Sequence, residues 1–76
     1  MDHDAELDAL GLLCPLPVLK ARKRMSALAA GQVLRMSTDD PAALIDVPHY
    51  CTEAGHELLA QQEAEGVAIF LIRKSD

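Results

Sequence analysis

The stretch Leu7-Asp8-Ala9-Leu10-Gly11-Leu12-Leu13-Cys14-Pro15-Leu16-Pro17 determines how this chain begins to fold. Its first half alternates in polarity and stops at a glycine, which is typical of a short strand over 7–11. Proline is tolerated in the first turn of a helix, because the amides there have no intrahelical partner. The sequence therefore predicts a helix whose first residue is Pro15 and whose N-cap is Cys14.

At that position the Cys14 thiol would meet the positive end of a helix dipole and free amides, including those of Leu16 and Val18. Helix N-termini can lower the pKa of a cysteine well below about 8.5. We therefore expect a reactive thiol with a lowered pKa at Cys14. The residues expected to support it are Pro15, Leu16, Pro17 and Val18. The alternative is a buried structural cysteine that happens to precede a helix.

Helical periodicity continues after this motif and predicts a helix over 15–29, closed by Gly31 as a left-handed C-cap. Its expected buried face consists of Val18, Ala21, Met25 and Leu28. Basic residues gather in its later half, where cations suit the negative end of the dipole. They are Lys20, Arg22, Lys23 and Arg24. A solvated face explains them, and a docking patch for an acidic partner is the alternative.

The rest of the chain predicts a strand over 32–38, a second helix and two further strands. The second helix is expected to begin at Pro41 with Asp40 as its N-cap, and to end at Gly55. Its expected buried face consists of Leu44, Val47, Cys51 and Ala54. Pro48 is expected to bend or interrupt it, because proline cannot donate to the carbonyl one turn back.

The last two strands are predicted over 56–62 and 67–74, joined as a hairpin. The final strand is continuously apolar, which favours a central position in the sheet. The predicted order is therefore βαβαββ. Its fold class is an α/β (α+β) two-layer sandwich with two helices on one face of a four-stranded mixed sheet. We expect residues 1–76 to form a single domain.

Composition argues against several classes of protein. The chain carries a net charge of −5, and its only aromatic residues are Tyr50 and Phe70. Neither property suits direct nucleic-acid binding, which relies on basic surfaces and base-stacking aromatics. No apolar run approaches the roughly 20 residues of a membrane span, and the acidic start lacks the features of a secretory signal. We expect a cytoplasmic protein, with reduced thiols and no membrane contact.

The remaining candidate ligands are interpreted as structural. Cys51 is expected in the core, and a disulfide with Cys14 is disfavoured in a reducing compartment. His49, Cys51 and His56 lack the spacing of zinc ligands, so neither a metal nor a cofactor is expected.

Three aspartates could be mistaken for a carboxylate cluster. Capping explains Asp40, and solvation is the expected role of Asp39 and Asp46.

The opening stretch 7–17 resembles the signature of the TusA family of sulfur carrier proteins, whose members include SirA-like proteins. Asp39-Asp40-Pro41-Ala42 is similar to a second family segment, as is Asp46-Val47-Pro48 followed by Cys51. The closing Leu71-Ile72-Arg73-Lys74 extends the likeness to almost the whole chain. The resemblance implies the same βαβαββ two-layer fold.

It also implies that Cys14 accepts a sulfane sulfur as a persulfide from a cysteine desulfurase and passes it to downstream relay proteins. The best-known endpoint in the family is 2-thiouridine at the wobble position of certain tRNAs. Such a protein is more a persulfide carrier than a stand-alone enzyme. A thiol-independent interaction or regulatory module remains the alternative. A redox enzyme is a weaker one, because no resolving cysteine lies beside Cys14.

Leu13 and Leu16 occupy positions where family members often carry charged or polar residues. Together with Leu12 they would form an apolar collar suited to transient protein contacts. The alternative is that some of these leucines fold into the core. The complete docking surface is expected to consist of Leu12, Leu13, Leu16, Lys20, Lys23 and Arg24. Donor and acceptor are expected to share it and so to exclude each other.

Overall fold

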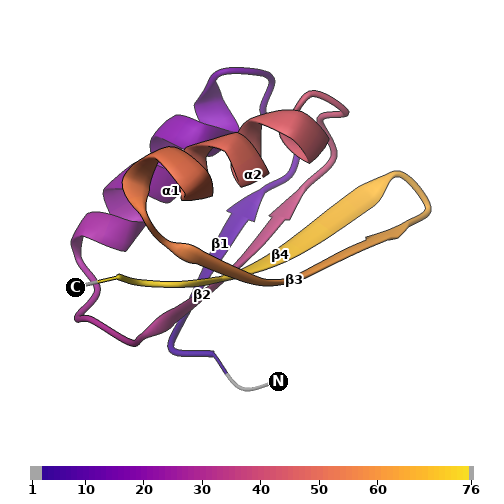
Figure 1. Ribbon diagram of the computed structural model, residues 1–76. Coiled ribbons are helices and arrows are strands. Elements are labelled where there is room, and N and C mark those ends of the chain that lie inside the picture. The colour runs from indigo at the N-terminus through magenta and orange to yellow at the C-terminus, as the bar shows by residue number, and fades with distance from the viewer. Residues whose placement is uncertain (1–2, 76) are drawn as a thin grey trace.

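The computed structural model describes residues 3–75 and has two layers, with two helices over one face of a four-stranded sheet (Figure 1). Its elements are β1 (Ala5–Ala9), α1 (Leu16–Ser26), β2 (Val33–Thr38), α2 (Ala43–Ala54), β3 (Glu57–Ala64) and β4 (Val67–Arg73). The predicted βαβαββ order and two-layer architecture are confirmed.

The sheet is mixed, with the strand order β1-β2-β4-β3. β1 pairs with β2 in parallel, whereas β4 pairs antiparallel with both β2 and β3. The apolar final strand therefore lies inside the sheet, as its sequence predicts. The register aligns Leu7 with Met36 and Met36 with Phe70, which places three buried side chains in one row across the sheet.

The core forms between this face of the sheet and the two helices. Strands β2 and β4 bury every second side chain, because successive residues of a strand point to opposite faces. The helices add buried apolar residues from α1 and α2, namely Ala21, Met25, Val47, Tyr50 and Cys51. Full burial of a side chain such as Met25 or Phe70 stabilises the fold by about 1.5–3 kcal/mol.

β1 begins and ends two residues earlier than predicted, over Ala5–Ala9. The amide of Leu10 donates to the Asp8 carboxylate at 2.9 Å, and Gly11 follows with φ of 79°. Both observations describe a turn, since aspartate side chains readily bond the backbone two residues on and glycine accepts a positive φ. The chain thus leaves the sheet before Leu10.

α1 is shorter than predicted at both ends. Pro15 is its N-cap, so the expectation that Cys14 caps the helix is wrong. The Leu16 amide donates to the carbonyl of Leu13 at 2.9 Å, and the Leu19 amide donates to that of Pro15 at 3.1 Å. A turn over residues 13–16 therefore precedes the helix, and Cys14 lies within that turn.

At its other end α1 stops at Ser26, with Ala27 as the C-cap. Gly31 is left-handed, with φ of 87°, but it lies beyond the helix and does not cap it. Its amide donates instead to the carbonyl of Lys74 at 2.9 Å, which fastens the start of β2 to the end of β4. Leu28, expected on the helix face, packs against the core from outside the helix.

α2 begins at Ala43, two residues later than predicted, and its N-cap is Ala42 rather than Asp40. The helix continues through Pro48 without interruption, and left-handed Gly55 ends it as expected. Ala54 is exposed, so its predicted place on the buried face is wrong. Tyr50 is buried instead, one turn before Ala54.

β3 lies at the edge of the sheet, and its pairing with β4 shifts register between Leu58 and Ala60. The predicted hairpin is present and turns through Glu65 and Gly66, with φ of 52° and 79°. Positive φ at both central residues is the pattern of a two-residue type I′ turn. Within residues 3–75, neither helix has the length and apolar character needed to cross a membrane.

Candidate functional site

Cys14 lies exposed in the loop between β1 and α1. Because β1 and β2 are parallel and Ala9 pairs with Thr38, the loops that follow the two strands leave the same edge of the sheet. In sheets with parallel strands, ligand and reaction sites form outside the carboxyl ends of the strands. The topology thus brings the Cys14 loop next to the loop that opens with Asp39 and Asp40.

The two aspartates hold the Cys14 loop through its backbone. The Asp40 carboxylate accepts the amide of Cys14 at 2.6 Å and that of Ala42 at 3.1 Å. Asp39 accepts the amide of Gly11 at 3.0 Å. Hydrogen bonds to charged groups contribute about 1.5–3 kcal/mol each, and Asp40 is only 8% exposed. Asp39 is exposed, as its expected solvation implies, but it also holds the Gly11 amide, whereas buried Asp40 joins two loops.

The thiol itself contacts α2. Cys14 Sγ donates a hydrogen bond to Asp46 Oδ2 at 3.1 Å, from the loop to the first turn of that helix. The expectation that Asp46 is merely solvated is wrong. Sequence reasoning missed this contact, although Asp39, Asp40 and Asp46 all lie in the segments that carry the family resemblance. The family resemblance of these segments was therefore the one signal in the sequence that could have pointed to aspartates near Cys14.

The pKa of the Cys14 thiol is raised above its ordinary value, which contradicts the expected lowering. The hydrogen bond to Asp46 is the largest cause, followed by desolvation and by the negative charges of Asp46 and Asp40. The physical reason is positional. α1 begins only at Leu16, whose amide is already bonded to Leu13, so carboxylates rather than helix amides surround the sulfur.

A groove of about 250 Å³ runs from Cys14 between the two helices. Its lining side chains are Cys14, Pro15, Val18, Arg22, Asp46, His49, Tyr50 and Glu53. The Arg22 guanidinium lies over the Tyr50 ring, 5.1 Å from its centre, and His49 Nε2 pairs with Glu53 at 2.8 Å. Of the predicted supporting residues, Pro15 and Val18 line this groove, whereas Pro17 is buried in the core.

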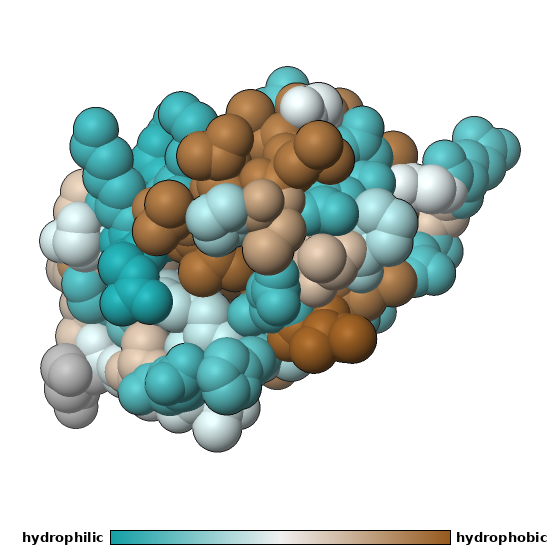
Figure 2. Space-filling view, turned by 90° about the horizontal axis from the view of Figure 1, so that it is seen from above, coloured by the Kyte–Doolittle hydropathy of each residue, from teal (hydrophilic) through white to brown (hydrophobic). Residues whose placement is uncertain are grey.

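The expected apolar collar is present in part. Leu13 is 69% exposed and Leu16 is exposed as well, while Leu12 is half-buried against the core. Three further large apolar side chains are exposed: Leu10, Leu19 and Ile45. Figure 2, which looks down on the helix layer, shows hydrophobic side chains gathered together with hydrophilic ones around them.

The basic residues of α1 fall into two groups. Lys20, Lys23 and Arg24 line a groove beside Leu10 and Leu12, and Cys14 is not part of it. In this groove Arg24 donates to the carbonyl of Glu6 at 2.7 Å. The basic side chain in the Cys14 groove is Arg22, which sequence reasoning left out of the site.

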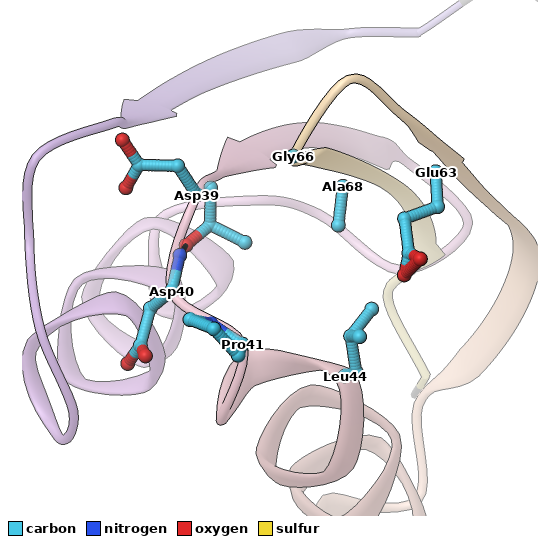
Figure 3. Close-up of a pocket in the computed structure, with 8 residues that line it drawn as sticks. Asp39, Asp40, Pro41, Leu44, Glu63, Gly66 and Ala68 are labelled. Carbon is cyan, nitrogen blue, oxygen red and sulfur yellow. Dashed lines mark hydrogen bonds between the residues drawn. The ribbon is translucent and has the colours of Figure 1, made fainter.

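A separate pocket of about 200 Å³ opens between the start of α2 and the β3–β4 hairpin (Figure 3). Its lining consists of Thr38, Asp39, Asp40, Pro41, Leu44, Glu63, Gly66 and Ala68. Asp40 contributes to this pocket and also anchors the Cys14 amide, so it stands between the pocket and the thiol loop.

Cys51 is a core residue, as predicted. It is 2% exposed, burial raises its pKa to about 11, and both cysteines are free thiols. His49 is exposed beside Glu53, whereas His56 Nδ1 accepts the amide of Ser75 at 3.1 Å. In the part of the chain that the structure describes, no three metal-ligating side chains come together.

Comparisons with known proteins identify the family of this chain. The sequence profile of the family described as "Sulfurtransferase TusA" matches residues 5–74. The chain is 50% identical to the sulfur carrier protein TusA of Pseudomonas entomophila over 72 residues, which covers 95% of this chain and 90% of the relative. It is 45% identical over 74 residues to that of Allochromatium vinosum, covering 97% of each chain.

Among solved structures, the crystal structure of a SirA-like protein from Desulfitobacterium hafniense matches with a TM-score of 0.84 and 27% identity. The match covers 96% of this chain and all of the other. With a family profile that spans almost the whole sequence and relatives of up to 50% identity, this chain belongs to the TusA family.

Proposed function

We propose that this chain is a sulfur carrier that holds a sulfane sulfur as a persulfide on Cys14. A cysteine desulfurase loads it, and downstream relay proteins unload it, with 2-thiouridine at the tRNA wobble position as the endpoint. Membership of the TusA family supports the carrier role, because the relatives are named sulfur carrier proteins. The proposed relay operates in the cytoplasm, where thiols are kept reduced.

The observation that carries this proposal is the contrast between the two cysteines. Cys14 is exposed on a loop held by Asp40, so a partner's sulfur can approach it directly. Cys51 is buried, and its raised pKa keeps it a thiol. Since only the thiolate is a good nucleophile, Cys51 is unsuited to sulfur transfer.

The carrier needs little beyond an accessible thiol, because its substrate is a sulfur atom delivered by another protein. The groove beside Cys14 is open at the surface and leads from the thiol along the two helices. We therefore assign catalysis of sulfur release to the donor and acceptor, and assign presentation of the thiol to this chain.

The proposed docking surface extends from the leucines beside the thiol to the separate basic groove of α1, and it is shared by donor and acceptor. It consists of Leu12, Leu13, Leu16, Lys20, Lys23 and Arg24, and we add exposed Leu10, which lines the same groove as Leu12 and the basic residues. Apolar anchors near the centre of an interface carry most of its affinity, while charges at the rim adjust the association rate.

Intact-mass measurement after incubation with a cysteine desulfurase and cysteine tests the proposal. The wild-type chain and a Cys51→Ala variant should each gain the mass of sulfur, and Cys14→Ser should gain none. An adduct mapped to Cys51, or equal loading of Cys14→Ser, would refute the assignment. If no variant is loaded although partner proteins still bind, the thiol-independent interaction module becomes the better account.

A competition experiment tests the shared surface. The chain is immobilised, saturated with a desulfurase, and challenged with a relay acceptor. The acceptor should displace the desulfurase. A stable complex with both proteins bound to one copy of the chain would contradict a single docking surface.

A further inference from the structure

We propose that Asp46 holds Cys14 as a hydrogen-bonded, weakly nucleophilic thiol while the carrier is free, and that a basic side chain of the docking partner pairs with Asp46 and releases the thiolate. This inference rests on the proposed carrier function. It assigns Asp46 as a positioning residue for the thiol, and it assigns the partner a cationic group at a defined place.

The geometry of the contact selects the protonated thiol. Cys14 Sγ lies 3.1 Å from Asp46 Oδ2. An ionised carboxylate only accepts hydrogen bonds, so the sulfur must supply the proton. If Cys14 loses that proton, two negative charges face each other at the same distance and repel. The arrangement therefore stabilises the thiol and disfavours the thiolate, and the raised pKa of Cys14 agrees with it.

Within residues 3–75, every influence found on the Cys14 thiol raises its pKa, so none of them offsets Asp46. Asp40, from the β2–α2 loop, adds a second carboxylate, whose oxygens accept the amides of Cys14 and Ala42. Arg22, the cation that α1 contributes to the groove, is stacked on Tyr50.

On α2 the groove also contains a histidine and a second acid. His49 pairs with Glu53 at 2.8 Å. Among the ion pairs found within residues 3–75, none includes Asp46. The Asp46 carboxylate is only partly buried and borders the open groove, so a side chain from outside can reach it.

A basic side chain arriving there would change the state of the thiol. Pairing with a cation neutralises Asp46 and occupies its oxygens, which removes the hydrogen-bond acceptor and the repulsion together. The Cys14 proton then leaves to solvent. The apolar surroundings of Leu13, Leu16 and Ile45 would be covered on docking, which strengthens the ion pair by excluding water.

The transfer step that follows is balanced without any added oxidant or reductant. The Cys14 thiolate attacks the terminal sulfur of the donor's cysteine persulfide, and a new S–S bond forms on Cys14. The donor's S–S bond breaks, and its electron pair leaves on the donor cysteine as a thiolate. Sulfur is thereby passed on at constant oxidation level, and delivery to an acceptor cysteine is the same exchange with the roles reversed.

The first arm of the test measures the free carrier. In a Cys51→Ala background, alkylation by iodoacetamide at neutral pH reports the thiolate of Cys14. Asp46→Asn preserves shape but removes the charge, so the alkylation rate should rise roughly threefold or more. Glu65→Gln is the charge-matched control at the exposed hairpin turn and should leave the rate unchanged. Equal rates in Asp46→Asn and the wild type would overturn the proposal.

The second arm measures sulfur loading by a desulfurase with the same proteins. Asp46→Asn should load more slowly at low salt, because the partner's cation loses its counterpart, even though its free thiol alkylates faster. Loading that rises in step with alkylation would overturn the partner's role. A wild-type chain that is never loaded would refute the carrier function instead, while the alkylation arm still decides the role of Asp46.

A measurement on the unmutated site covers the case in which Asp46→Asn does not fold, as judged by circular dichroism. The pH dependence of alkylation of the Cys51→Ala chain should give an apparent pKa for Cys14 above that of a short unstructured cysteine peptide. A value at or below that of the peptide would overturn the proposal.

Discussion

Replacing Asp40 with alanine should destabilise the protein far more than its place in a surface loop suggests. The Asp40 carboxylate accepts two amides, from Cys14 and from Ala42, and is 8% exposed. A hydrogen bond to a charged group contributes about 1.5–3 kcal/mol. Water can replace part of the bond to the exposed Cys14 loop, so we expect a loss of about 2 kcal/mol in the free energy of unfolding.

The corresponding fall in melting temperature is about 8–16 °C, because 1 kcal/mol corresponds to roughly 4–8 °C in a domain of this size. Thermal unfolding followed by circular dichroism, with urea unfolding at a fixed temperature, measures both quantities. Asp40→Asn keeps one acceptor oxygen and should lose about half as much. Asp39→Ala removes one exposed bond, to the Gly11 amide, and should cost about 0.5–1 kcal/mol.

The order of these three variants is the critical result. If Asp40→Ala is no less stable than Asp39→Ala, then Asp40 does not anchor the thiol loop, and the account of the site as two joined loops is wrong.

Two further predictions concern docking and pH. Leu13→Asp should slow desulfurase-dependent loading at all salt concentrations. Reversing Lys20, Lys23 and Arg24 to Glu should slow loading mainly at low salt, because salt screens charges at the rim of an interface. Equal salt dependence of the two variants would contradict their assigned roles. Burial, and then the charge of Lys74, lowers the pKa of His56, so the folded state resists its protonation. Stability from this source is present above the unfolded pKa of about 6.5 and is lost as pH falls below it. The free energy of unfolding should therefore drop more between about pH 7.5 and 5.5 in the wild type than in His56→Asn, and parallel curves for the two proteins would refute this.

Much of the fold follows from local pattern. The alternation of 33–38, the apolar run of 67–72 and the glycine at 55 specify their elements directly, and the structure agrees with them. The prediction failed at the helix starts, because a proline marks the neighbourhood of a start without showing which residue caps it. Pro15 and Pro41 both precede the first residue of the helix that they were expected to begin.

The site was less predictable than the fold, because its electrostatics depend on contacts between distant residues. Cys14 is 26 and 32 residues away from the two aspartates that bond its amide and its sulfur. The dipole of the neighbouring helix predicts a lowered pKa for the Cys14 thiol. That prediction has the wrong direction, because it leaves out residues that are distant in the sequence. The parallel pairing of β1 and β2 brings the loop that carries the aspartates next to the Cys14 loop. The carboxylates there raise the pKa of Cys14 instead of lowering it.

The edge strands have a consequence for how this protein behaves at high concentration. Exposed leucines invite self-association, and a strand with unpaired backbone groups invites a copy to extend the sheet. Two features of β3 disfavour the pairing of another strand with this edge. They are its shift in register after Leu58 and its exposed polar residues Gln61, Gln62 and Glu63. The β1 edge exposes Glu6 and Asp8. Charged and irregular edges resist edge-to-edge pairing between copies of the chain. The chain can therefore expose apolar side chains to its partners without aggregating through its sheet.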